Sequence, residues 1–185
     1  AGTSAKNTYV ENTRFEGNKA DEIGAMGMFS AGTLKNVVFY NNTATSTDAL
    51  SDGAGALFLG AVSSTDVDGV LSDSVFDSNT SGARGGAIAT RAFKDGNNTA
   101  ASLDIKNTMF KNNIAKTNGG ALDNFFYHSA TNADAVYMAG SSFVNNSALN
   151  GGAIYNHGSS SVQHASASVS EQAGAIEINN AKFVD

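Results

Sequence analysis

A motif of fixed form recurs along this chain, and it constrains the fold more than any other feature. A Phe is followed three residues later by an Asn, and a Gly-Ala-hydrophobe step comes a short distance downstream. The Phe–Asn pairs are Phe15/Asn18, Phe39/Asn42, Phe76/Asn79, Phe110/Asn113 and Phe143/Asn146, and Phe183 begins a further copy. The downstream steps start at Gly24, Gly55, Gly86, Gly120 and Gly152. Repeats with a period of roughly 20–50 residues indicate a solenoid or an array of small units.

Alignment of the copies on their Phe defines the local structure of one unit. The residue five positions before each Phe is always apolar: Val10, Leu34, Leu71, Ile105, Met138 and Ile178. The residue three positions before it is Asn, Asp or Gly, the types that tolerate a left-handed backbone: Asn12, Asn36, Asp73, Asn107, Gly140 and Asn180. The unit is therefore predicted to contain a strand, a polar corner, a short strand with an inward Phe, an Asn corner and a third strand at the Gly-Ala step.

The spacing of the Phe residues predicts how these units stack. Successive Phe are 24, 37, 34, 33 and 40 residues apart, so the shortest interval represents a bare unit and the others carry insertions. Three strands and three corners in that length make one coil of a parallel β-helix, and five to six coils are predicted. The Phe residues would form an inward ladder, and the Asn residues a second ladder at a corner. Insertions are predicted mainly on one side, at 58–68, 89–101, 123–135 and 155–172, with another at 43–53.

Composition fits this fold and excludes several functions. The 185 residues suit one domain covering 1–185, and no apolar run reaches the length of a transmembrane helix. The net charge of −6 disfavours a nucleic-acid partner, because phosphate binding requires a basic surface. The chain has no Cys and no Pro. Absence of Pro is expected in a chain that consists almost entirely of sheet ladders, because Pro cannot donate to a ladder.

The paired Phe-x-x-Asn and Gly-Gly-Ala-hydrophobe motifs resemble the polymorphic outer membrane protein repeat and the passenger domains of autotransporter adhesins. The full Gly-Gly-Ala step occurs at Gly85, Gly119 and Gly151, whereas Ile23 and Ala54 replace the first Gly in the first two copies. The resemblance covers essentially the whole chain. It implies a right-handed parallel β-helix at the bacterial cell surface, as a fragment of a longer passenger anchored in the outer membrane and without membrane insertion of its own.

The expected function is therefore adhesion or self-association without catalysis. Partners would be a host-cell protein or glycan, or another copy of the chain bound through polar ladders on a flat face. Exposed aromatic and His residues in the insertions are candidate contacts, because aromatic side chains contribute strongly to binding. The candidates are Phe93, Phe125, Phe126, Tyr127, His128 and His157. For the segment 125–128, a strand with one Phe turned inward is the competing interpretation.

Two alternatives remain open at this stage. Some right-handed β-helices are pectate-lyase-like polysaccharide enzymes, which need carboxylates facing one another across a groove. Here the acidic residues are scattered, and the His157-Gly158 pair lacks the companion motifs of such enzymes. The Asp66-Val67-Asp68-Gly69 segment has only the first ligands of a Ca²⁺ loop, so neither a metal nor a cofactor is expected. The other alternative is a purely structural stalk segment.

Overall fold

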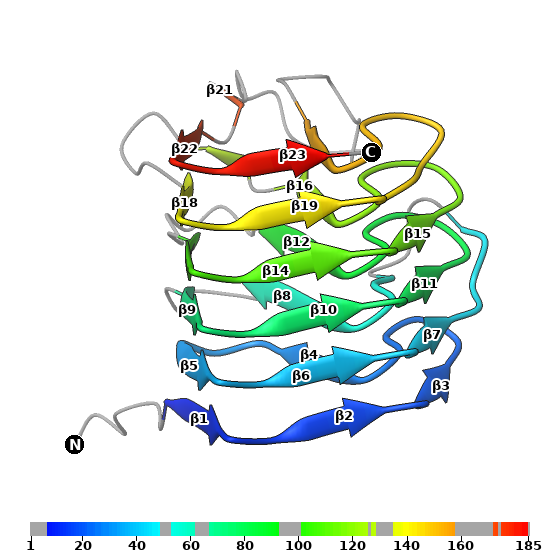
Figure 1. Ribbon diagram of the computed structural model, residues 1–185, viewed down its shortest axis with the longest axis horizontal. Coiled ribbons are helices and arrows are strands. Elements are labelled where there is room, and N and C mark those ends of the chain that lie inside the picture. Colours follow the sequence, from blue (N-terminus) through cyan, green and yellow to red (C-terminus); the bar gives the residue numbers. More distant parts are fainter. Residues whose placement is uncertain are drawn as a thin grey trace, which may run out of the picture.

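The computed structural model describes residues 7–48, 53–61, 67–92, 101–125, 127–128, 135–157, 172–173 and 175–184. Within these ranges the chain contains strands and no helix, and thus no helix that could cross a membrane. The chain runs along the front, turns back behind and climbs by one layer per turn, which makes a right-handed parallel β-helix (Figure 1). The fold class is thus as predicted.

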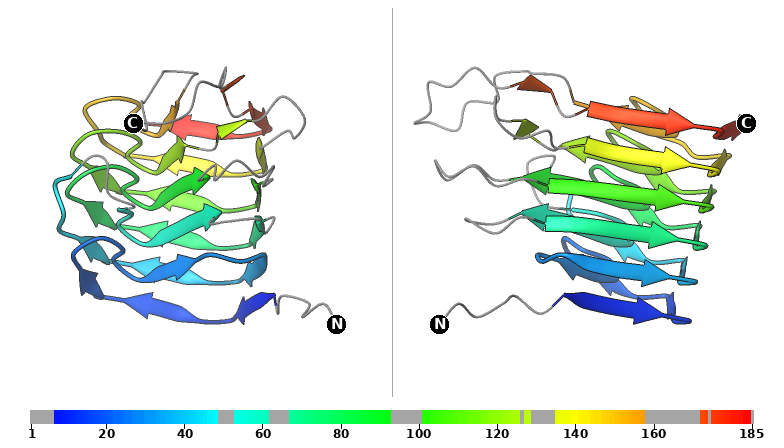
Figure 2. Two further views of the ribbon diagram at one scale, coloured as in Figure 1. Left: turned by 180° about the vertical axis from the view of Figure 1, so that it is seen from behind. Right: turned by 90° about the vertical axis from the view of Figure 1, so that its left-hand side faces the viewer.

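Six coils are stacked, and equivalent strands of successive coils pair in parallel to form four sheets (Figures 1 and 2). Sheet 1 comprises β1 (Thr8–Glu11), β5 (Gly32–Lys35), β9 (Val67–Ser72), β13 (Ala101–Lys106), β18 (Ala135–Ala139) and β22 (Ala175–Asn179). Sheet 2 comprises β2 (Arg14–Glu16), β6 (Val38–Tyr40), β10 (Val75–Asp77), β14 (Met109–Lys111), β19 (Ser142–Val144) and β23 (Lys182–Val184).

Sheet 3 continues the first four coils and sheet 4 the first five. Sheet 3 comprises the two-residue strands β3 (Lys19–Ala20), β7 (Thr43–Ala44), β11 (Thr80–Ser81) and β15 (Ile114–Ala115). Sheet 4 comprises β4 (Met26–Met28), β8 (Leu57–Ala61), β12 (Ile88–Ala92), β16 (Leu122–Phe125) and β20 (Ile154–Asn156). The three predicted strands correspond to sheets 1, 2 and 4, and sheet 3 adds a short fourth strand directly after the Asn corner. A separate antiparallel pair joins β17 (Tyr127–His128) to β21 (Gln172–Ala173).

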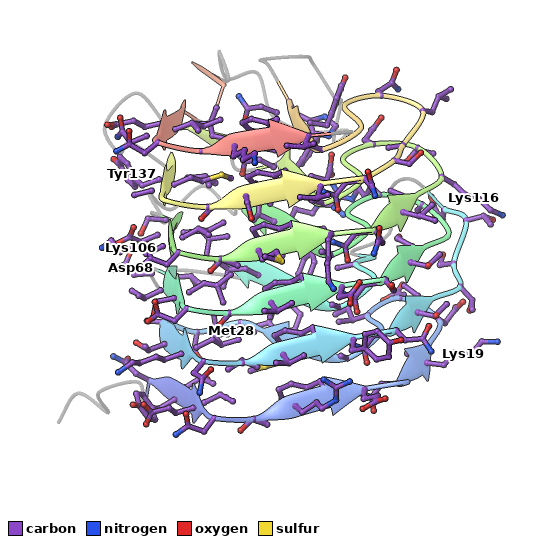
Figure 3. The ribbon with its side chains drawn as sticks, viewed as in Figure 1. Lys19, Met28, Asp68, Lys106, Lys116 and Tyr137 are labelled. Carbon is purple, nitrogen blue, oxygen red and sulfur yellow. The ribbon has the colours of Figure 1, made fainter. Side chains whose placement is uncertain are left out.

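The Phe ladder is the centre of the core. Phe15, Phe39, Phe76, Phe110, Phe143 and Phe183 occupy equivalent positions of sheet 2. Neighbouring rings stack with centroids 4.7–5.1 Å apart. The four central rings are fully buried, whereas Phe183 in the last coil is 50% exposed. Aliphatic residues of sheets 1 and 4 surround the rings, among them Leu34, Leu71 and Ile105. Met28 of sheet 4 extends the same core into the first coil (Figure 3).

The Asn ladder seals the corner between sheets 2 and 3. The side-chain oxygen of Asn79 accepts hydrogen bonds from the backbone N–H and the side chain of Asn42 in the coil before it. The Asn79 amide group in turn donates to the Phe39 carbonyl and to the side-chain oxygen of Asn113. Asn18 and Asn146 complete the ladder at its two ends. Because Asn42, Asn79 and Asn113 are fully buried, the ladder satisfies corner groups that water does not reach.

Left-handed backbone occurs three residues before each Phe, as predicted, with φ of 48–63°. The Gly before Ala is required by close backbone approach between stacked coils in the first four Gly-Ala steps, whereas Gly152 in the last step meets nothing closer than 3.2 Å. A Cβ on Gly55 would lie 1.9 Å from the Gly86 carbonyl oxygen, and one on Gly86 would lie 2.0 Å from that of Gly120. The left-handed residues of these steps are the first Gly: Gly85, Gly119 and Gly151.

The insertions are shorter than predicted. Strands of sheet 4 run on to Ala61, Ala92, Phe125 and Asn156, deep into the stretches assigned to insertions. The β7 strand likewise occupies the start of the predicted insertion at 43–53. The rest of the predicted insertions, at 62–66, 93–100, 129–134 and 158–171, lies outside the described residues. The connections from sheet 1 to sheet 2 are tight corners in every coil.

Candidate functional site

The outer side of sheet 4 carries a group of polar and aromatic side chains that contact one another. Parallel register places Phe58, Ala89, Asp123 and Tyr155 in one outward row. Arg91 and Phe125 form the next row, and His157 follows directly after β20. Outward residues of a solenoid normally face solvent, yet Phe58, Ala89 and Asp123 are fully buried. The turns between sheets 3 and 4 contribute to covering them, because Ile23 and Ala54 of these turns pack on Phe58.

Asp123 is the centre of this group. Its carboxylate accepts a hydrogen bond from Arg84 Nη1 at 3.2 Å through one oxygen and lies 2.9 Å from His157 Nε2 through the other. Arg84, from the turn before β12, is 3% exposed, and the His157 side chain is 18% exposed. This distance allows a hydrogen bond between the His157 ring and the carboxylate. This buried arrangement needs both partners, because an unpaired carboxylate in such a site is strongly unfavourable.

Aromatic contacts hold the same residues in place. The His157 ring meets Phe125 edge-on at 4.2 Å and Tyr155 at 4.6 Å between centroids. The Arg84 guanidinium lies 5.2 Å from the centre of the Phe125 ring, within the range of a cation–π interaction. Beneath them, the buried Thr90 hydroxyl donates to the Asn124 side-chain oxygen at 2.7 Å. The group is therefore a packed clamp between coils 3, 4 and 5.

The predicted contact residues lie in different environments. Phe125 is on the outer side of sheet 4, not turned inward, and is only 9% exposed because it packs against His157 and Arg84. His157 keeps a partly exposed edge, but its ring is already held by neighbours in the same chain. Tyr127 and His128 form β17, paired with β21. Phe93 and Phe126 lie outside the described residues.

The clamp was missed at the sequence level because Asp123 and His157 fall in stretches assigned to insertions, away from Arg84. A signal for it exists in the printed sequence. Counting on from each Gly-Ala step aligns Phe58, Ala89, Asp123 and Tyr155 one residue after the inward hydrophobe of each step. Chemically, the clamp does not present a free carboxylate, because both Asp123 oxygens are engaged and shielded from solvent. Within the described ranges, no group of three or more acidic or His side chains is arranged to hold a metal ion.

The second candidate site is the flat outer face of sheet 2, which all six coils build without interruption (Figure 1). Its first outward row is Arg14, Val38, Val75, Met109, Ser142 and Lys182, and its second row is Glu16, Tyr40, Asp77, Lys111, Val144 and Val184. Apolar residues therefore occupy the middle of the first row, and an opposite-charge pair the middle of the second. Met109 is 42% exposed.

Asp77 and Lys111 mark the midpoint of this face. Lys111 Nζ lies 3.0 Å from an Asp77 oxygen, and Ser78 and Asn112 donate hydrogen bonds to the same carboxylate. Partial burial raises the pKa of Asp77, but the hydrogen bonds from Lys111, Ser78 and Asn112 outweigh it and hold the pKa below its ordinary value. The carboxylate is thus charged at neutral pH, beside an ammonium group on the next coil.

The fold defines a solenoid protein in which buried polar residues join successive coils. Comparison with protein families identifies the repeat itself. Residues 73–91 and 140–157 match the Chlamydia polymorphic membrane protein repeat. These are equivalent stretches of coils 3 and 5, each running from the left-handed corner before sheet 2 through sheet 4.

The chain therefore contains repeats of the polymorphic membrane protein type. At a coarse level, this match supports a surface protein of the outer membrane with adhesin-like character. No curated protein and no solved structure matches the chain.

Proposed function

We propose that this chain is a segment of a surface-displayed passenger that mediates adhesion, including adhesion between copies of itself, and that it performs no catalysis. The observation that carries the proposal is the uninterrupted outer face of sheet 2, six coils long, on a scaffold with repeats of the polymorphic membrane protein type. Burial and full engagement of Asp123 support the non-catalytic part, since a general acid or base must reach its substrate.

The pattern on sheet 2 favours contact with a second copy in antiparallel orientation. A two-fold axis parallel to the strands, between coils 3 and 4, would place coil 3 opposite coil 4 of the second copy, coil 2 opposite coil 5 and coil 1 opposite coil 6. Asp77 would then face Lys111 of the second copy, and Lys111 would face its Asp77. In the neighbouring row Val75 would face Met109 of the second copy, so an apolar contact would form beside the charged pairs. A two-fold interface must be self-complementary in this way.

The size of this face predicts weak binding. Three residues per strand and six strands cover an area about 10 Å by 25 Å, given the usual rise per residue and strand spacing. Such an interface lies at or below the lower limit of stable complexes. Weak contacts suffice on a cell surface, however, because many displayed copies bind together and their avidity exceeds the single affinity by orders of magnitude.

A display experiment tests the function. The intact parent protein is displayed on a non-adherent bacterium with and without this segment, and cell clumping and host-cell binding are scored separately. Loss of either score on deletion is expected, and unchanged scores in both assays would contradict the proposal.

Charge reversal tests the face. Lys111→Glu should reduce clumping, because the introduced carboxylate would face Asp77 of the other copy, and the double variant Asp77→Lys with Lys111→Glu should restore it. Lys35→Glu is the matched control, since Lys35 forms a similar pair with Glu11 (3.7 Å) on sheet 1. Equal clumping by Lys111→Glu and Lys35→Glu cells would rule out this face while leaving adhesion through the loops to be judged by host-cell binding.

A further inference from the structure

Two Asn-Gly dipeptides occur in the chain, Asn118-Gly119 and Asn150-Gly151, and they occupy the same turn in consecutive coils. An Asn followed by Gly can modify itself without an enzyme. The backbone nitrogen of the Gly attacks the Asn side-chain carbon, a carbon–nitrogen bond forms, and the side-chain nitrogen leaves as ammonia. Water then opens the resulting five-membered imide at either carbonyl, which yields aspartate or isoaspartate. Gly favours the attack because no Cβ obstructs it.

The structure places the two dipeptides in opposite situations. Gly119 is buried, and its backbone N–H donates to the Asn150 carbonyl at 3.0 Å. Attack by the Gly119 nitrogen therefore requires this hydrogen bond to break first. Asn150 and Gly151 are both exposed, and the Gly151 N–H has no acceptor among the described residues. The attacking nitrogen is thus hydrogen-bonded at Gly119 in coil 4 but not at Gly151 in coil 5.

We propose that Asn150 is a site of spontaneous deamidation in the folded protein, and that Asn118 is protected from it by the coil above. Breaking one such buried backbone bond costs about 0.5–1.5 kcal/mol net. This cost corresponds to a roughly two- to tenfold slower reaction at Asn118, at about 1.4 kcal/mol per factor of ten. The proposal is independent of the adhesive function.

Modification at Asn150 would weaken the hydrogen bonds that hold this turn of coil 5 against the equivalent turn of coil 4. The Asn150 side-chain amide donates to the Asn118 side-chain oxygen at 3.0 Å, and aspartate lacks this donor. Isoaspartate also adds one carbon to the main chain. The extra carbon would move the carbonyl of residue 150 away from the Gly119 N–H. It would also disturb the hydrogen bond of 2.8 Å from the Asn150 N–H to the Thr117 carbonyl. The β20 strand follows this turn directly, so its pairing with β16 is expected to weaken with time.

Peptide mapping by mass spectrometry tests the proposal on the intact chain. The purified protein is incubated in mildly alkaline buffer, folded in one arm and unfolded in urea in the other. Both sites should convert at similar rates in urea, and Asn150 should convert roughly two- to tenfold faster than Asn118 when folded. Equal rates in the folded arm, or conversion of neither site there, would overturn the proposal.

Amide hydrogen exchange tests the consequence. Exchange at Leu122, whose backbone N–H donates to the Ala153 carbonyl at 3.0 Å, should become faster as Asn150 converts in the wild-type chain. The variant Asn150→Gln keeps an amide at this position but forms the imide much more slowly, and its exchange rate at Leu122 should stay constant over the same incubation. An increase in Asn150→Gln as large as in the wild type would show that loosening has another cause.

Discussion

Replacement of Asn79 by Ala tests the reasoning about the Asn ladder most directly. Asn79 is fully buried at the centre of the ladder, and its side chain takes part in four hydrogen bonds of 2.9–3.1 Å. Two of them connect it to Asn42 below, one to the Asn113 side chain above and one to the Phe39 carbonyl. Asn79→Ala removes all four while leaving the backbone ladder in place.

The expected cost follows from the groups that remain. Asn113 keeps a donor, because the backbone N–H of residue 79 still bonds to its side-chain oxygen at 3.0 Å. The Asn42 side chain also keeps its bond to the Phe15 carbonyl. The Phe39 carbonyl and the Asn42 N–H lose their side-chain partners. A buried group left unsatisfied costs about 1–3 kcal/mol, so Asn79→Ala should lower the free energy of unfolding by about 2–6 kcal/mol.

Urea unfolding followed by circular dichroism measures this change, and hydrogen exchange at coils 2 and 3 shows where it acts. Asn18→Ala is the matched control: Asn18 is exposed at the end of the ladder, and the Asn42 side-chain oxygen keeps the Asn18 backbone N–H as donor. A cost below about 1 kcal/mol is expected for the control. If both variants lose the same stability, hydrogen bonding in the ladder does not stabilise the solenoid as argued.

Three further predictions concern other elements of the scaffold. Gly86→Ala should prevent folding or greatly destabilise the protein, because the new Cβ would lie 2.0 Å from the Gly120 carbonyl oxygen. Gly152→Ala is the control: its Cβ would lie no closer than 3.2 Å to any atom, and the variant should express as a folded protein. Phe110→Ala should lower the free energy of unfolding, measured in urea, by about 3–5 kcal/mol. A loss as small as that from replacing an exposed side chain would contradict the stacking of Phe110 inside the core. The depressed pKa of Asp77 means that its carboxylate stabilises the folded protein above the ordinary Asp pKa of about 4, and that this contribution is lost as the pH falls through the lower pKa of the folded state. Asp77→Asn should therefore reduce the loss of stability in that pH range during acid unfolding. An unchanged dependence of stability on pH would exclude the contribution.

The inward positions of this fold are predictable from sequence because every coil imposes the same demand. Phe76 must fit between Phe39 and Phe110, and Asn79 must exchange hydrogen bonds with an identical residue on each side. Identical neighbours force identical side chains, so the repeat is visible in the printed sequence. The left-handed corners are predictable for the same reason, since only a few residue types tolerate that backbone.

Other features could not be predicted from the repeat alone. The two-residue strands of sheet 3 are too short to show an alternating pattern. The role of Gly86 depends on the distance between stacked backbones, which a single coil does not reveal. The clamp of Arg84, Asp123 and His157 combines residues from three coils, each present once. Alignment of the Gly-Ala steps places Asp123 in an outward row, but the sequence does not show that Arg84 and His157 of the neighbouring coils reach it.

This contrast bears on where specificity can lie. Inward positions cannot vary without disturbing the coils above and below, so they define the scaffold and not the partner. Outward positions are less constrained by their neighbours and differ from coil to coil, as the row Glu16, Tyr40, Asp77, Lys111, Val144 along sheet 2 shows. Proteins with the same repeat can therefore share a solenoid and still recognise different partners. Exchange of the sheet 2 outer row between two such proteins should transfer the preference for self-association without changing the fold, which the clumping assay with mixed cells would reveal.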